Sequence, residues 1–230
     1  MRDTVNPSSP DHGPSGRAPA GREQARTRLA RRAVVDAARR LFLDGGYSAT
    51  TIAAISAASG VPEPTVYRLF ASKIGILKTL LDVSIAGDDE PVAVPERPGV
   101  ASLLDEPDPH QVLAGFSAVT TQINRRTSDV YHVLGRAADS DAEAGELFRT
   151  LRDQRDHGQG RIVRALHDRR QLRPGLAVDR AADIVHAVMA PEVYRLLVAD
   201  RGWTPDQYQR WATDTLIQQL TGAPAGNPVQ

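Results

Sequence analysis

Polar, aromatic and basic side chains gather between Glu63 and Arg68 in the pattern of a surface that contacts nucleic acid. On a helix, Val66, Leu69 and Phe70 fall on one side, as an apolar face would. The other side carries Glu63, Thr65, Tyr67 and Arg68. A helix divided in this way packs one face into a core while the other enters the major groove, where it contacts phosphates and base edges.

The segment before this helix supplies the turn that such a helix needs. Ile52, Ile55 and Ser59 recur at i, i+3 and i+7, so a short helix with one apolar edge is expected. Gly60 and then Pro62 end it, which is typical of a left-handed helix cap. The two helices together predict a helix-turn-helix.

Flanking segments predict two supporting helices, and the later one brings a basic residue to the site. The apolar stripes are Val34, Ala38, Leu41 and Phe42 upstream, and Ile74, Leu77, Leu80 and Leu81 downstream. Ser72 is the expected N-cap of the downstream helix. Lys73 follows it, at a helix N-terminus that attracts anions, so we expect it to contact a phosphate.

Taken together, these motifs resemble the N-terminal domain of the TetR family of bacterial transcriptional repressors, over about residues 29–81. The resemblance rests on Phe42–Tyr47, Thr50-Thr51-Ile52, Gly60-Val61, Thr65-Val66-Tyr67-Arg68-x-Phe70 and Ser72-Lys73. It implies that Thr51 touches phosphate, that Tyr67 and Lys73 do the same, and that the recognition helix carries or adjoins Glu63, Pro64, Thr65, Tyr67 and Arg68.

The sequence departs from the family pattern at three positions. Pro62 stands where a capping serine is usual, so the hydroxyl that would accept from early helix amides is missing. Pro64 replaces a common glycine, which a first helical turn tolerates. Ile74 replaces a frequent glutamate. We therefore expect docking on DNA to be kept, while the preferred base sequence does not follow.

The charge distribution agrees with a DNA-binding N-terminal part. The formal net charge is zero, but residues 1–80 hold 12 lysines and arginines against 6 acidic residues, and residues 81–230 hold 16 against 22. Phosphate contacts supply most non-specific affinity, so a local excess of positive charge is what matters. Neutrality of the whole chain is compatible with DNA binding.

Residues 1–28 are rich in proline, serine and glycine, and we expect them to form a disordered basic tail. We expect residues 223–230 to form a disordered tail that carries no charge. The arginines of the N-terminal tail favour a solubilising role over a role as an arm that enters the minor groove. No apolar run suits a signal peptide or membrane span, and the chain has no cysteine. We expect a cytoplasmic protein without membrane contact, cofactor or metal.

Residues 82–222 are expected to form a second helical domain, which makes the whole chain all-α. Expected helices cover two stripes from Pro109 to Leu134, then 142–170, 178–189, 191–199 and 205–220. Within 178–220 the apolar residues exceed what one face needs, so homodimerisation is placed there. The segments 87–91, 191–194 and 201–205, with the arginine and alanine bias, resemble a TetR subgroup common in actinobacteria.

The resemblance implies that the second domain binds a small-molecule effector and that binding shifts the recognition helices. Candidate pocket residues are aromatic or polar groups on apolar stripes: Phe116, Thr120, Asn124, Tyr131, Phe148, Arg152 and His186. The expected function is a ligand-responsive repressor that binds a palindromic operator as a homodimer.

Two alternatives belong to other classes of protein. One is an all-helical HD-type metal-dependent phosphohydrolase, suggested by His132, His157, His167-Asp168 and Asp183. The pattern needs only common residues at loose spacing, and the chain has no HExxH motif or phosphate-binding loop. The other is a helical partner-binding module that does not bind DNA. We expect no enzymatic activity.

Overall fold

The computed structural model describes residues 20–87 and 98–222, and all regular structure in them is helical. The elements are α1 Ala20–Ala49, α2 Ile52–Ser59, α3 Glu63–Phe70, α4 Lys73–Ala86, α5 Pro98–Ala101, the 3-10 helix η2 Ser102–Leu104, α6 Pro109–Ala138, α7 Ala142–Asp168, α8 Val178–Val188, α9 Pro191–Arg195, the π-helix η3 Leu196–Asp200 and α10 Pro205–Thr221.

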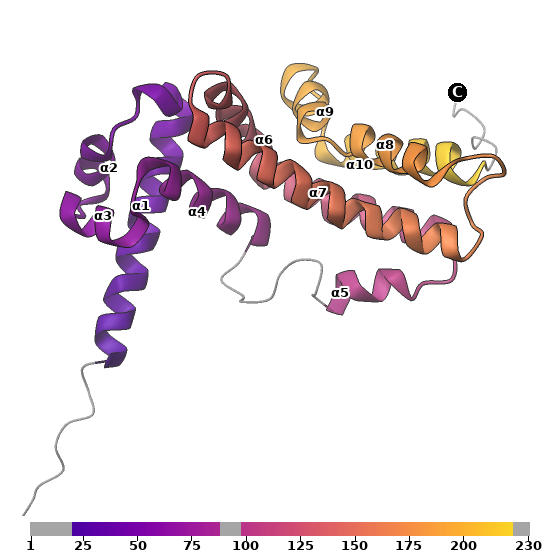
Figure 1. The fold of residues 1–230 in the computed structure, drawn as a ribbon, viewed down its shortest axis with the longest axis horizontal. Coiled ribbons are helices and arrows are strands. Elements are labelled where there is room, and N and C mark those ends of the chain that lie inside the picture. The colour runs from indigo at the N-terminus through magenta and orange to yellow at the C-terminus, as the bar shows by residue number, and fades with distance from the viewer. Residues whose placement is uncertain (1–19, 88–97, 223–230) are drawn as a thin grey trace, which may run out of the picture.

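An N-terminal bundle of α1 to α4 packs against one end of the long antiparallel pair α6 and α7 (Figure 1). Its core holds Val34, Phe42, Ile55 and Val66 together with Leu77. That cluster continues into α6 and α7, so the bundle and the second domain share apolar contacts. Further along α6 and α7, a second cluster brings in α8, α9 and α10.

The helix starting at Ala20 corrects the expected tail boundary. Residues 20–28 were assigned to a disordered tail, yet they form the first turns of α1, which project away from the bundle (Figure 1). Alanine, arginine, glutamine and glutamate favour helix without any packing partner, which explains the missing apolar periodicity. The tails predicted at residues 1–19 and 223–230 lie outside the described residues.

Two further boundaries differ from expectation. α4 runs to Ala86 and ends at Gly87 in the left-handed region, so a boundary after residue 81 falls inside a helix. The stripes expected as separate segments between Pro109 and Leu134 form the single helix α6. Part of its central polar run is buried, including Thr121, Asn124 and Thr127. Asn124 Nδ2 donates to Met189 O at 3.0 Å, and Thr127 Oγ1 donates to Ile123 O of the same helix at 2.9 Å.

Candidate nucleic-acid interface and effector cavity

The recognition-helix candidate α3 presents a polar face to solvent. Val66 and Phe70 are buried and Leu69 is half-buried, as the spacing predicted. Thr65 is half-buried, and the exposed positions are Glu63, Pro64, Tyr67 and Arg68. The Tyr67 side chain is 50% exposed, which is a large aromatic surface to leave in water. These residues lie on one short helix, where a groove-contacting face requires them.

The turn between α2 and α3 has the geometry that the sequence predicted. Thr51 is the N-cap of α2, and its Oγ1 accepts from Ala54 N at 3.1 Å. Gly60 adopts φ 69°, ψ 12°, a left-handed conformation that suits glycine. Ser56 Oγ donates to Val61 O at 2.7 Å and holds the turn. Pro62 gives α3 no side-chain cap, which leaves its first turn dependent on backbone bonds.

Lys73 has a structural role that the sequence did not indicate. Its Nζ donates to Tyr47 O at 2.9 Å and to Thr50 O at 3.0 Å, and it lies 4.1 Å from the centre of the Tyr47 ring. Burial lowers the pKa of Lys73, and nearby Asp141 opposes part of that shift. Two of its three donors are therefore committed to joining α4 to the end of α1. A phosphate contact through the third donor stays a prediction.

Arg31 positions the other end of α3. Its Nη1 donates to Leu69 O at 2.9 Å, and its guanidinium lies 4.8 Å from the centre of the Phe70 ring. A cation at the last carbonyls of a helix compensates the helix dipole. The sequence gave no signal for this role, because Arg31 belongs to a run of similar arginines and its partners are 38 residues away.

A cavity of about 400 Å³, partly open to solvent, lies between α4, α5, η2, α6 and α7. Four predicted residues line it: Phe116, Thr120, Asn124 and Tyr131. Burial raises the pKa of the Tyr131 phenol to about 12. Asn124 already bonds Met189 O, so only part of its amide is available.

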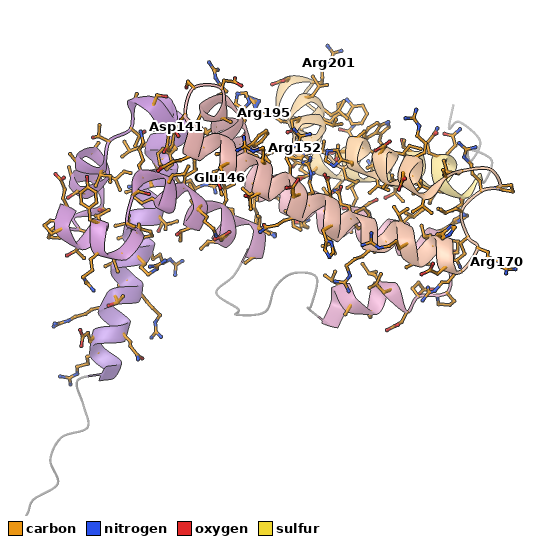
Figure 2. All side chains as sticks on the ribbon, in the orientation of Figure 1. Asp141, Glu146, Arg152, Arg170, Arg195 and Arg201 are labelled. Carbon is orange, nitrogen blue, oxygen red and sulfur yellow. The ribbon has the colours of Figure 1, made fainter. Side chains whose placement is uncertain are left out.

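Three of the residues predicted for an effector pocket do not line this cavity. Phe148 packs against Tyr131 on the side of the N-terminal cluster, with ring centres 5.8 Å apart. Arg152 is exposed on α7 (Figure 2). His186 on α8 pairs with Asp156 and shares a 2.9 Å contact between its Nε2 and Arg155 Nη2. These positions satisfy the apolar periodicity of their helices, but the cavity opens on another face of α7.

Sequence reasoning missed the α7 residues that do line the cavity. They include Arg155, Gly158, Gln159 and Arg161. Arg155 Nη1 lies 3.7 Å from Glu192 Oε2, but Nε and Nη1 of Arg155 are buried without a hydrogen-bond partner among the described residues. Gln159 is only 6% exposed, and its Oε1 has no hydrogen-bond partner among the described residues. Charged and polar residues on a largely charged helix gave no periodic signal.

The cavity and the bundle share α4. Asp82, Ile85 and Ala86 at its C-terminal end belong to the cavity wall. Arg126 of α6 donates from Nε to Ser84 O at 2.9 Å and from Nη2 to Ile85 O at 3.0 Å. The N-terminal end of α4 directly follows α3, so α4 joins the cavity wall to the helix-turn-helix.

Part of the apolar excess within 178–220 belongs to the core. Val185 and Met189 are fully buried, and Ile184 and Val188 are half-buried. Leu196 is 51% exposed, and Trp203 and Trp211 are half-buried with their ring centres 6.1 Å apart. An incompletely covered apolar surface therefore remains on these helices.

Among the residues that the structure describes, no three His, Cys, Asp or Glu side chains form a group that could hold a metal. The histidine pattern of the phosphohydrolase alternative thus has no assembled centre in residues 20–87 and 98–222. None of the helices in this part of the chain is long and apolar enough to span a membrane.

Residues 34–80 match the sequence profile of bacterial regulatory proteins of the tetR family. This stretch covers about half of α1, all of α2 and α3, and more than half of α4, so the matched region contains the whole helix-turn-helix. No curated protein matches the chain.

Solved structures share the fold over most of the chain. A Syntrophomonas wolfei protein described as a TetR-family transcriptional regulator has a TM-score of 0.67 at 18% identity, covering 87% of this chain and 99% of that one. NalD of Pseudomonas aeruginosa, the secondary repressor of the MexAB-OprM multidrug efflux pump, has a TM-score of 0.66 at 20% identity, covering 86% of this chain and 100% of that one. SmeT of Stenotrophomonas maltophilia, in complex with triclosan, has a TM-score of 0.62 at 18% identity, covering 87% of this chain and 96% of that one. The fold is that of TetR-type regulators.

Proposed function

We propose that the protein is a ligand-responsive transcriptional regulator of the TetR type, and that it represses by binding a palindromic operator as a homodimer. The observation that carries the proposal is the α3 face, with Tyr67 and Arg68 exposed on a helix that is anchored by Val66 and Phe70. The tetR profile match over the same helices supports it. A regulator of this kind works in the cytoplasm, where the bacterial chromosome lies.

The proposed DNA contacts divide by what each residue would touch. Thr51 and Tyr67, with the remaining donor of Lys73, would bind phosphates and set the docking of α3. Glu63, Thr65 and Arg68 would face base edges, with Pro64 beside them. An affinity with an actinobacterial subgroup remains a prediction from the sequence.

A small molecule in the cavity would release the protein from DNA. SmeT, which shares this fold, was solved in complex with triclosan, and this supports a small-molecule ligand here. The effector must bind better to the conformation that does not fit DNA, because only differential affinity shifts the equilibrium. α4 is the element that both sites would bias, since it contributes to the cavity wall and adjoins α3.

Dimerisation would use the apolar surface of residues 178–220 and place two copies of α3 on successive half-sites. One helix-turn-helix reads only a half-site, so a twofold pair doubles the contacts. The partly covered side chains of Ile184, Leu196 and Trp211 support this placement.

Variants of α3 test the DNA-binding proposal on a duplex selected by the native protein. Tyr67→Ala should weaken binding to all duplexes alike, because a phosphate contact carries no base information. Arg68→Ala should cost about 1–3 kcal/mol of binding free energy and relax the preference at one base position. Fluorescence anisotropy at several salt concentrations measures both effects.

The matched control is Arg170→Ala, which removes an exposed arginine at the end of the molecule opposite α2 and α3 (Figure 2). It should leave affinity and salt dependence unchanged. Equal affinity of all three variants and the native protein at low salt would contradict the assignment of α3 as the DNA-binding element.

A further inference from the structure

The cavity lies along α7. Its wall includes α7 residues from Leu151 to Ile162, which corresponds to about 16 Å along the helix axis. We call the volume of about 400 Å³ beside this length of helix the slot. An extended chain fits such a space better than a compact ring system does.

Most of the wall is apolar. Ile85, Leu103, Phe116, Val119 and Ile123 contribute side chains from α4, η2 and α6. At Gly158, a Cβ atom would meet nothing within 4 Å, so α7 leaves open space in the middle of the wall. Water there would gain few hydrogen bonds, and an apolar chain would displace it favourably.

Polar side chains occur in both halves of the α7 wall, Gln154 and Arg155 before Gly158 and Gln159 and Arg161 after it. Gln159 and Arg161 are two residues apart, which is about 3 Å along the helix axis. The Gln159 side chain is buried, and its Oε1 has no hydrogen-bond partner among the described residues. An amide can present its NH₂ group after rotation, so it can also serve as a donor.

Arg161 brings a positive charge to the second half of this wall. No hydrogen-bond or ion-pair partner for it lies within residues 20–87 and 98–222. Arg155 adds a second positive charge: its Nη1 lies 3.7 Å from Glu192 Oε2, but neither Nε nor Nη1 has a hydrogen-bond partner among the described residues. Asp82, the acidic residue in the wall, pairs with Lys78 at 2.7 Å. The electrostatic field near Arg161 therefore favours an anion.

We infer that the effector is a single-chain amphiphile with one anionic head group, of which a medium-chain carboxylate is the simplest example. The chain occupies the apolar slot beside Gly158, and the head group accepts hydrogen bonds from Arg161 and from the amide of Gln159. This inference rests on the proposed function, since it gives the chemistry of the effector of that regulator.

Calorimetric titration of the full-length protein, without DNA, tests the inference with decanoate and with decanol as the neutral match. Decanoate should bind at one site per subunit, at least about tenfold tighter than decanol, because only the anion uses the charged end. Arg161→Gln should remove this preference and leave decanol binding unchanged. The control Arg164→Gln, an exposed arginine outside the wall, should keep it.

Filling the slot gives an independent readout. Gly158→Trp should abolish binding of both probes, whereas Gly158→Ala should retain it; circular dichroism verifies that each variant is folded. Equal affinity for decanoate and decanol, retention of the preference in Arg161→Gln, or no binding of decanoate to the folded native protein would each overturn the inference. Operator binding by the same preparation separates the two proposals, because it tests DNA recognition without any ligand.

Discussion

At the scale of single residues, the two lysines of the chain differ in what their charges do. Lys73 is tied to the carbonyls of Tyr47 and Thr50, while Lys78 forms an exposed pair with Asp82 at 2.7 Å. Burial raises the pKa of the Tyr47 phenol to about 12, which indicates that water is largely excluded here. Hydrogen bonds are stronger in such an environment. Lys73, which the family resemblance predicts to contact a phosphate, is thus also a structural link between α1 and α4.

Lys73→Met should lower the free energy of unfolding by about 1–3 kcal/mol, because two partly buried carbonyls lose their donor. Lys78→Met, the matched control, should change it by less than about 0.5 kcal/mol, since an exposed i, i+4 pair contributes little. Urea unfolding followed by circular dichroism measures both. A cost for Lys73→Met no larger than that for Lys78→Met would contradict the structural role.

At the scale of elements, sequence spacing predicted the helix-turn-helix well because its cues are local. Gly60 ends α2, Ser72 caps α4, and Val66 and Phe70 are buried, each as the pattern required. The same reasoning predicts two helices in place of α6, because polar residues at its centre interrupt the apolar stripe. Asn124 is satisfied by Met189, 65 residues away, and no local pattern contains that partner.

The cavity shows the same limit. Phe116 and Tyr131 line it as predicted, but the residues that give it polar character, Gln159 and Arg161, lie on a helix dominated by charged side chains. Which of these faces an enclosed space depends on how α4, α6 and α7 pack, a long-range outcome that residue spacing does not encode.

Arg126 is the element-scale test of coupling between the cavity and α3. Arg126→Ala removes the donors that hold Ser84 O and Ile85 O, so the C-terminal turn of α4 loosens. We expect operator affinity to respond less to an effector, because α4 no longer moves as one body. Arg125→Ala, an exposed neighbour, is the control. Identical effector responses in both variants, measured as the ratio of operator affinities with and without ligand, would rule out this link.

At the scale of the whole molecule, two copies must associate for two recognition helices to reach one operator. Ile217→Asp places a charge on the half-buried surface of α10 and should convert a dimer into monomers of 24.9 kDa. Leu29→Asp changes a 68% exposed leucine on α1 and should leave the dimer intact. Analytical ultracentrifugation distinguishes these states. A native protein that sediments as a monomer at micromolar concentration would contradict dimerisation.

The central claim is that this chain reads DNA with α3, and selection of bound duplexes from a random pool tests it most directly. We predict enrichment of an inverted repeat whose half-site centres lie about 34–36 Å apart or a multiple of this. A Tyr67→Ala, Arg68→Ala double variant should enrich nothing above background. Failure of the native, folded protein to enrich any sequence, or enrichment of the same repeat by the double variant, would contradict the claim.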